Sequence, residues 1–285
     1  MAVAGPEARL FHDFLVAGLA TADGGTRRTP PKGGLQTEKL VPKMLYHLHS
    51  HLDASAIVEF CFPDVDDSAS PSESFTFTLT NDDSTRTFGF CRRLVQESSL
   101  PICLCVLSRR PWFSLFMHML DILQLNYDLA RFVPAFVTAA YEAPLPPAGS
   151  PSASIRIDPL VRGESFYGTF RLTPPQEDRP TGVHFGPLLE ALGVANVLRV
   201  LAALMTEQHV IFVGARWGHV SGCAHAATVL LYPLQWQHIF IPVLPQSKLS
   251  YAGAPMPYVL GVLSRHLPAL QAEPLDQVLF VDVTS

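Results

Sequence analysis

A segment rich in proline and serine divides the chain into two halves with different hydrophobic patterns. It reads PLPPAGSPSAS over residues 144–154, a composition typical of a linker that carries no core side chains. Alternating stretches and then apolar helical stripes precede it, whereas strand-like and helix-like stretches take turns after it. We therefore predict a first module over residues 1–143 and a second module over residues 155–285, joined by this linker.

The first half contains the alternation of an antiparallel sheet. Apolar residues alternate with threonines over residues 74–80, which predicts a strand with one buried and one solvent-facing side. Turn-forming residues at 81–84 lead into a second alternating stretch around Phe88, so the two stretches predict a β-hairpin. The wholly apolar residues 102–107 predict a central strand.

Three helices are expected in the same half. Apolar residues recur at intervals of four over residues 40–52, the spacing of one helical face, and Pro42 suits a first turn. Apolar stripes over residues 113–123 and 129–140 predict two more helices, the second with a kink or restart at Pro134. Strands followed by helices predict an α+β layer.

The second half predicts an α/β module. A strand at 209–213, a helix at 220–232 and a strand at 238–243 form a βαβ unit, so we expect parallel strands and a right-handed crossover. The remaining expected elements are helices at 185–192, ended by Gly193, and at 197–207, and strands at 259–263 and 278–281. The predicted fold class is therefore α+β followed by α/β with a largely parallel sheet.

Composition and charge exclude several classes of function. Hydrophobic residues make up 48% of the chain and charged residues 16%, so the body of the chain is globular. The net charge of −5 argues against nucleic acid as a partner, because phosphate binding needs a dense basic face. The four lysines (Lys32, Lys39, Lys43 and Lys248) make no polybasic membrane anchor.

The chain also shows no segment expected to enter a membrane. Its first residues lack the pattern of a signal peptide, and the longest apolar run, 197–205, contains Arg199 and is too short to cross a bilayer. We expect a soluble cytosolic protein or fragment that meets membranes only indirectly.

Three histidines at alternate positions, His47, His49 and His51, are similar to the His-x-His ligand pairs of metallohydrolases. Zinc favours imidazole ligands. However, the helical spacing of residues 40–52 puts only His47 and His51 on a common face. A solvent-facing helix is the favoured interpretation, and no metal site is predicted.

Other candidate motifs favour structural roles. The loop 214–218 lacks the Lys-Ser/Thr pair of a P-loop and the third glycine of a dinucleotide fingerprint, which favours a plain βα turn. Ser221 beside His219 lacks the context of a nucleophile elbow. The five cysteines, an odd number, lie in apolar stretches such as that of Cys103 and Cys105, which favours buried, inert thiols. No catalytic residue and no cofactor are predicted.

Several segments are more specific than composition explains. They are FCFPD at 60–64, SFTFTLTNDDSTRTFGFCRRL at 74–94, LS-x-x-x-x-FSLF at 107–116, EAPLPPAG at 142–149, LLYPLQWQHIFIPVLP at 230–245 and APMPYVLG at 254–261. In order and spacing they resemble the upstream and central parts of DENN domains, from about Leu10 to the end of the chain. FCFPD, FSLF and EAPLP are most similar to the type-2 DENN-domain proteins.

The resemblance implies a longin-like first module and a central DENN α/β second module, with the downstream DENN part absent or shortened. It also implies guanine-nucleotide exchange on a Rab-family small GTPase at endosomal or Golgi-derived vesicles. A non-catalytic GTPase-binding scaffold is an alternative. A third is a GTPase-activating protein that uses Arg109 or Arg110, although arginine pairs at strand ends, here 92–93 and 109–110, are solvated by default.

Two segments depart from the family pattern. Thr206–His209 stands where the family usually has an acidic-Arg-Arg run, and Arg216–Val220 stands where it usually has a Lys-Leu-Ser-Thr-Leu loop. We expect both segments at one βα edge, where they bear on local contacts and on exchange activity.

The GTPase is expected to dock in a cleft between the two modules, since clefts between modules are preferred binding places. The helix after Leu107 carries more apolar residues than one buried stripe needs, which leaves Trp112, Leu115 or Met117 for a partner. On the second module, loop or strand-end positions offer Gln237, Tyr251 and Met256. The alternative is that all six residues pack between the modules.

Overall fold

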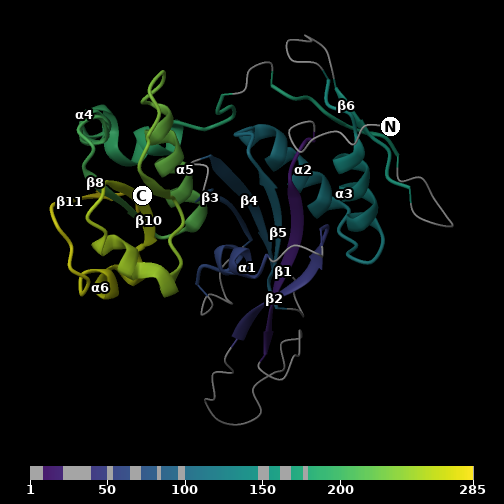
Figure 1. Ribbon diagram of the computed structural model, residues 1–285, viewed down its shortest axis with the longest axis horizontal. Coiled ribbons are helices and arrows are strands. Elements are labelled where there is room, and N and C mark those ends of the chain that lie inside the picture. The colour runs from purple at the N-terminus through teal and green to yellow at the C-terminus, as the bar shows by residue number, and fades with distance from the viewer. Residues whose placement is uncertain are drawn as a thin grey trace.

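The chain is built around two main β-sheets, one antiparallel and one parallel (Figure 1). The computed structural model describes residues 9–21, 40–49, 54–64, 72–81, 85–95, 100–146, 154–160, 168–175 and 179–284. The first sheet is antiparallel and the second is parallel, so the predicted fold class is confirmed.

The first sheet has the strand order β2-β1-β5-β4-β3. Its strands are β1 (Asp13–Thr21), β2 (Leu40–His47), β3 (Glu73–Thr80), β4 (Arg86–Leu94) and β5 (Ile102–Ser108). The predicted β3–β4 hairpin and the central position of β5 are confirmed. Helices α2 (Phe113–Leu125) and α3 (Phe132–Glu142) cover one face, and α1 (Ser55–Cys61) lies on the other (Figure 1).

The helix predicted over residues 40–52 is wrong. Residues 40–47 form strand β2, which pairs with β1, a strand that the sequence analysis does not identify. A spacing of four is also a multiple of the strand period of two, so Leu40 and Met44 share a face in either structure, and both pack on the core beneath α1. Leu52 lies outside the described residues.

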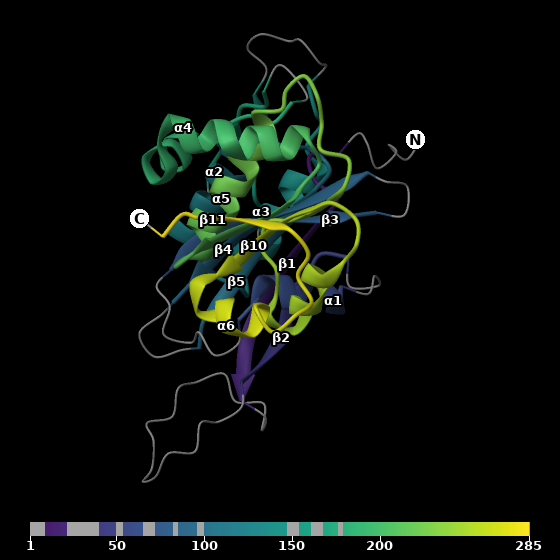
Figure 2. The ribbon, with the colours of Figure 1, turned by 90° about the vertical axis from the view of Figure 1, so that its left-hand side faces the viewer.

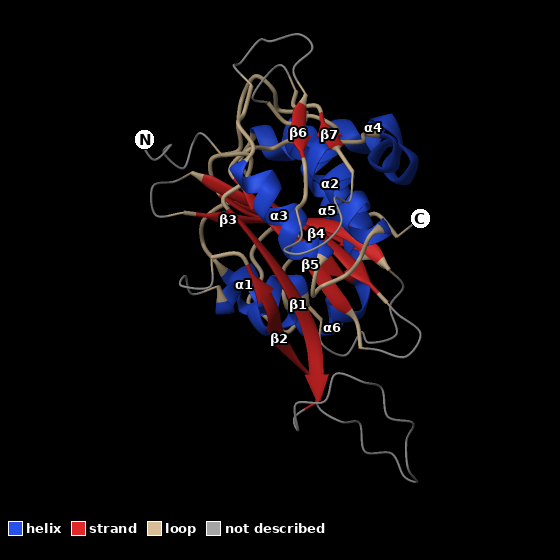
Figure 3. Ribbon diagram, turned by 90° about the vertical axis from the view of Figure 1, so that its right-hand side faces the viewer, coloured by secondary structure: helices blue, strands red, loops and turns tan. Residues whose placement is uncertain are grey.

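The other two predicted helices of this module are present. Helix α3 begins at Phe132, after Leu129, so Pro134 lies in its first turn. At that place the missing N–H of proline costs no helical hydrogen bond. The short strands β6 (Ile155–Ile157) and β7 (Phe170–Leu172) lie beside α2 and α3 (Figure 3) and add Ile155 to the same core. The division of the chain at residues 144–154 stays a prediction.

The second sheet has the strand order β11-β8-β10-β9. Its strands are β8 (His209–Gly214), β9 (Ile239–Ile241), β10 (Tyr258–Leu263) and β11 (Val278–Asp282). Strands β8 and β9 run parallel as predicted, with β10 between them. Figure 2 shows α4 (Gly186–Met205) and α5 (Trp217–Val229) above this sheet and α6 (Leu267–Leu270), with the 3₁₀ segment η2 (Gln246–Gly253), below it.

Helix α4 joins the two helices predicted over residues 185–207. Gly193 interrupts it with φ 67° and ψ 163°, a left-handed φ that glycine adopts at little cost. By length and composition alone, α4 could cross a membrane. Its Leu188, Val200 and Leu204 are buried in the core of the second module, as in a helix that lies on a sheet.

The two modules pack through β3 and α5. Thr76 and Thr78 are 3% and 1% exposed, so the side of β3 predicted to face solvent is covered as well, and α5 covers it. The buried carboxylate of Glu73 accepts a hydrogen bond from the backbone N–H of Gly218 at 3.2 Å. Gly218 is in the first turn of α5, and the helix dipole favours a negative charge, here that of Glu73, beside this end of the helix.

The carboxyl edge of the parallel sheet is the second part of this interface. Trp217, Val243 and Leu263 follow or end its strands, and all three are buried in one cluster with residues of α1 and β3. Asp64, 3% exposed, accepts from Arg265 and His266 at 2.5 and 3.0 Å. The edge where α/β sheets commonly bind ligands is therefore occupied by the first module.

Arg93 also differs from expectation. Its side chain is 1% exposed, and the guanidinium carbon lies 5.8 Å from the centre of the Phe62 ring. Strand β4 continues to Leu94, so Arg93 lies inside the sheet rather than at a solvated strand end.

A pair of glycines on α5 tests the interface. An alanine Cβ at Gly218 would lie 2.4 Å from the Ser74 carbonyl oxygen, whereas at Gly222 it would meet nothing within 4 Å. We expect Gly218→Ala to lower the free energy of unfolding by about 2 kcal/mol. The control Gly222→Ala should raise it by about 0.5–1 kcal/mol, because alanine is the better helix former. Urea unfolding measures both, and equal effects would contradict this packing.

His225 makes the interface sensitive to acid. Its ring lies among Phe88, Phe113 and Phe240, and burial lowers its pKa to about 3, with Arg86 acting in the same direction. The stability gained from the neutral ring is complete above the usual pKa of 6.5 and is lost as pH falls toward 3.

Between about pH 7.5 and pH 5 this group should cost about 2 kcal/mol of stability. His225→Phe keeps an aromatic ring and cannot titrate, so we expect it to flatten this part of the pH profile in urea unfolding. His118→Gln changes an exposed histidine and is the control. A profile of the same slope for His225→Phe and the unchanged protein would refute the assignment.

Candidate functional site

A cleft of about 530 Å³ opens between the two modules beside the β3–α5 contact. Its walls come from β3, from α2, from α5 and from the segment 182–187. Side chains that line it include Phe75, Met117, His118, Asp121, His184 and His219. The sequence-based expectation of a cleft between the modules is therefore met by the described residues.

The segment entering the second module closes one end of this cleft. Thr181 pairs with Trp112, and the backbone N–H of Ser114 donates to the Thr181 carbonyl at 3.4 Å. Gly182 has φ 80°, and a Cβ there would lie 1.7 Å from the Ser114 hydroxyl. Only glycine lets the chain pass this close to the start of α2, so the cleft wall has a fixed shape.

Three of the predicted docking residues lie at or near α2, and one of them lines the cleft. Met117 is half-buried in the cleft wall. Trp112 and Leu115 are only 6% and 5% exposed and belong to the core of the first module. The expectation that these two side chains are left uncovered is wrong, because Thr181 pairs with Trp112 and β7 also contacts α2.

The other three predicted docking residues are exposed and lie away from the cleft. Gln237 precedes β9 and Met256 precedes β10, so both lie at the amino edge of the parallel sheet. Tyr251, 50% exposed, lies on η2. The structure therefore does not bring the six residues into one surface, and contact of any of them with a GTPase stays a prediction.

A second hollow, of about 590 Å³, lies at this amino edge. The His209 ring lines it, with Nδ1 3.1 Å from the carbonyl oxygen of Asp276 and Nε2 3.1 Å from that of Met256. The ring nitrogen that carries the proton donates to the carbonyl it faces. The ring also stacks on Tyr258 with the ring centres 4.4 Å apart. His209 thus connects the start of β8 with the segments that lead into β10 and β11.

The two segments that depart from the family pattern lie at opposite ends of β8. Thr206–His209 leads into the strand at the amino edge, and Arg216–Val220 follows it at the carboxyl edge. The expectation of a single βα edge is wrong, because the 6 residues of β8 separate them. Trp217 and Gly218 take part in the module interface.

The histidines of the HLHSHLD segment bind a carboxylate rather than facing solvent. His47 Nε2 lies 2.6 Å and His49 Nδ1 3.2 Å from the two carboxylate oxygens of Asp13, which is 6% exposed. The prediction of a solvent-facing helix is wrong, since this segment ends strand β2. His51 lies outside the described residues.

Ser221 and the loop before α5 have structural roles. The Ser221 hydroxyl donates to the carbonyl of Gly218 and accepts the N–H of Thr76, both at 3.4 Å. Within the described part of the cleft, no hydrogen-bonded set of acid, base and nucleophile is present. The loop 214–218 connects β8 to α5 as the predicted βα turn. The described residues that could hold a metal are Cys61, Cys91 and Cys103, which lie in the core away from the cleft.

Comparison with known proteins identifies two family domains in this chain. Residues 99–285 match the DENN (AEX-3) domain and residues 42–94 match the uDENN domain. The chain is 34% identical to DENN domain-containing protein 2A of Mus musculus over 285 residues, which cover 97% of this chain and 28% of the relative.

Two human relatives show the same range of similarity. DENN domain-containing protein 2B of Homo sapiens is 35% identical over 98% of this chain and 25% of its own length. DENN domain-containing protein 2D of Homo sapiens is 33% identical over 80% of this chain and 49% of its own length. The chain thus spans about a quarter to a half of the length of these relatives. With its larger part matched by the DENN domain and its nearly full-length similarity to type-2 proteins, this chain belongs to the DENN domain family.

Proposed function

We propose that this chain is a guanine-nucleotide exchange factor for a Rab-family small GTPase. The observation that carries the proposal is its membership of the DENN domain family over both modules, together with the exchange activity that this family resemblance implies. The open cleft between the modules supports it, because a GTPase needs a preformed surface on which to dock.

Such a protein would act by binding and not by covalent chemistry. An exchange factor binds the nucleotide-free GTPase more tightly than the GDP-bound form, and by linkage it weakens nucleotide affinity by the same factor. An effect of about 10⁴-fold requires about 5.5 kcal/mol of differential binding. This mechanism requires a rigid surface complementary to one state of the GTPase, and it requires no cofactor.

The α2 wall of the cleft is the proposed docking surface. Met117 offers a polarizable apolar contact, and His118 and Asp121 beside it offer polar ones. The close packing at Gly182 and the hydrogen bond from Gly218 to Glu73 hold the opposing walls in place. Fixed walls lower the ordering cost of association.

The place of action follows from the partner. A Rab-bound exchange factor would be cytoplasmic and recruited peripherally to endosomal or Golgi-derived vesicles through the GTPase. The four lysines and the net charge of −5 support recruitment through a protein and not through anionic lipid.

Nucleotide release tests the activity. We expect this chain to accelerate the release of fluorescent GDP from at least one member of a Rab panel, and to bind that member more tightly without nucleotide. Binding to the nucleotide-loaded form with an unchanged release rate would replace the proposal with a scaffold. Faster GTP hydrolysis without faster release would instead favour an activating role for Arg109 or Arg110.

Charge placed on α2 tests the docking surface. Met117→Glu should slow exchange by about tenfold, the loss expected for one interface residue worth over 1 kcal/mol. His118→Asp, at an exposed position in the same cleft, should act in the same direction and has no core contact to disrupt.

Leu125→Glu is the matched control, because Leu125 lies on the same helix, is 84% exposed and does not line the cleft. Thermal melting separates misfolding from loss of docking. Tyr251→Glu examines the second module by the same assay. Normal exchange by folded Met117→Glu and His118→Asp variants would move the docking surface elsewhere.

A further inference from the structure

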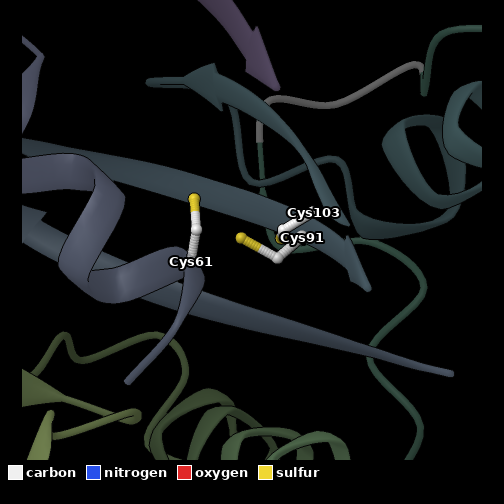
Figure 4. A group of neighbouring side chains, drawn as sticks. All are labelled: Cys61, Cys91 and Cys103. Carbon is white, nitrogen blue, oxygen red and sulfur yellow. The ribbon is translucent and has the colours of Figure 1, made fainter. Parts of the chain in front are cut away.

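Cysteine side chains from three elements meet in the core of the first module. The sulfur atoms of Cys61, Cys91 and Cys103 all lie within 4.8 Å of one another. Figure 4 shows Cys61 at the end of α1 with its sulfur pointing toward the sheet, where Cys91 of β4 and Cys103 of β5 lie. All three residues are fully buried.

A fourth buried thiol, that of Cys105, lies beside this group. Cys105 is the direct cross-strand partner of Cys91 and lies two residues after Cys103 on the same side of β5. Its thiol is hydrogen-bonded with the thiols of Cys61 and Cys91.

Three thiols that meet in one enclosed place, with a fourth beside them, offer the four-cysteine ligand set of structural zinc. Zinc binds thiolate sulfur at about 2.3 Å in a closed tetrahedron, which places the sulfurs roughly 3.8 Å apart. The sulfurs of Cys61, Cys91 and Cys103 already lie within 4.8 Å of one another, and Cys105 would complete the tetrahedron by rotation about its Cα–Cβ bond. Harder cations prefer oxygen ligands, of which the group offers none.

A buried positive charge lies beside the group. Burial raises the pKa of the Cys103 thiol well above its ordinary value, as does its hydrogen bond with Cys61, whereas the charge of Arg93 acts in the opposite direction. Four thiolates around one zinc ion carry a net charge of about −2, and a buried anion needs a compensating charge. The guanidinium of Arg93 supplies part of it.

We propose that Cys61, Cys91, Cys103 and Cys105 form a structural zinc site that fastens α1 to the sheet. Each thiol loses its proton on binding, and no electron is transferred. Helix α1 has only 7 residues and no side-chain cap. The chain directly after it supplies Asp64, which binds Arg265 and His266 of the second module, so the ion would also steady the module interface.

The metal content of the full chain tests the proposal. The protein is expressed with added zinc, purified under reducing conditions without chelator, and analysed by plasma mass spectrometry. We expect about one zinc ion per chain. Replacement by Co²⁺ should give thiolate charge-transfer bands and the visible bands of a tetrahedral ion. A folded chain that contains no bound zinc and whose melting temperature is unchanged by zinc during refolding would overturn the proposal.

Serine variants assign the ligands. Cys61→Ser, Cys91→Ser and Cys103→Ser should each reduce bound zinc and lower the melting temperature. Cys223→Ser is the matched control, because Cys223 is the fifth buried cysteine and lies on α5 in a different core. Equal zinc content in the control and in a folded Cys61→Ser variant would show that the ion binds elsewhere and would overturn the site.

Discussion

The packing of α5 against the outer side of β3 is the contact on which the rest of the structure depends. It converts a strand that could face water into one that is buried on both sides, at Phe75 and Phe77 toward one core and at Thr76 and Thr78 toward α5. Threonine suits this place because it is β-branched and small, so a helix can approach the strand closely. The two modules therefore share one buried cluster, and the walls of the cleft beside β3 belong to elements that pack against each other.

Much of the fold could be predicted because strand and helix periods differ. The alternation before residue 80 and the apolar stretch of β5 have a single interpretation. The period of residues 40–48 does not distinguish a strand from a helix, because a spacing of four fits both. Strand β1 decides the outcome, since it offers β2 a hydrogen-bonding edge. No local pattern in β2 contains that information, which is why the sequence analysis assigns a helix there.

The candidate site was less accessible from the sequence, because its walls depend on contacts between distant segments. The six suggested docking residues were chosen by two criteria, a surplus of apolar side chains near α2 and a position in a loop or at a strand end. Neither criterion shows which other segment covers a side chain. Trp112 is buried because residue 181, far along the chain, pairs with it. Gly182 is the residue of that segment that permits the close packing on α2, because glycine adopts a positive φ and has no Cβ. Without a partner segment in view, however, one glycine among 18 is not informative.

The polar groups of the interface set its orientation more than its strength. Buried carboxylates are costly unless paired, and Glu73 and Asp64 are each paired across the modules, with the start of α5 and with Arg265 and His266. A rotation of one module would separate these pairs at two separate places, whereas the surrounding apolar side chains could slide at lower cost. The angle between the modules is consequently specified by a few directional contacts. The cleft lies between the same two modules, so its shape depends on these directional contacts. A partner that binds the cleft therefore also binds one particular angle between the modules.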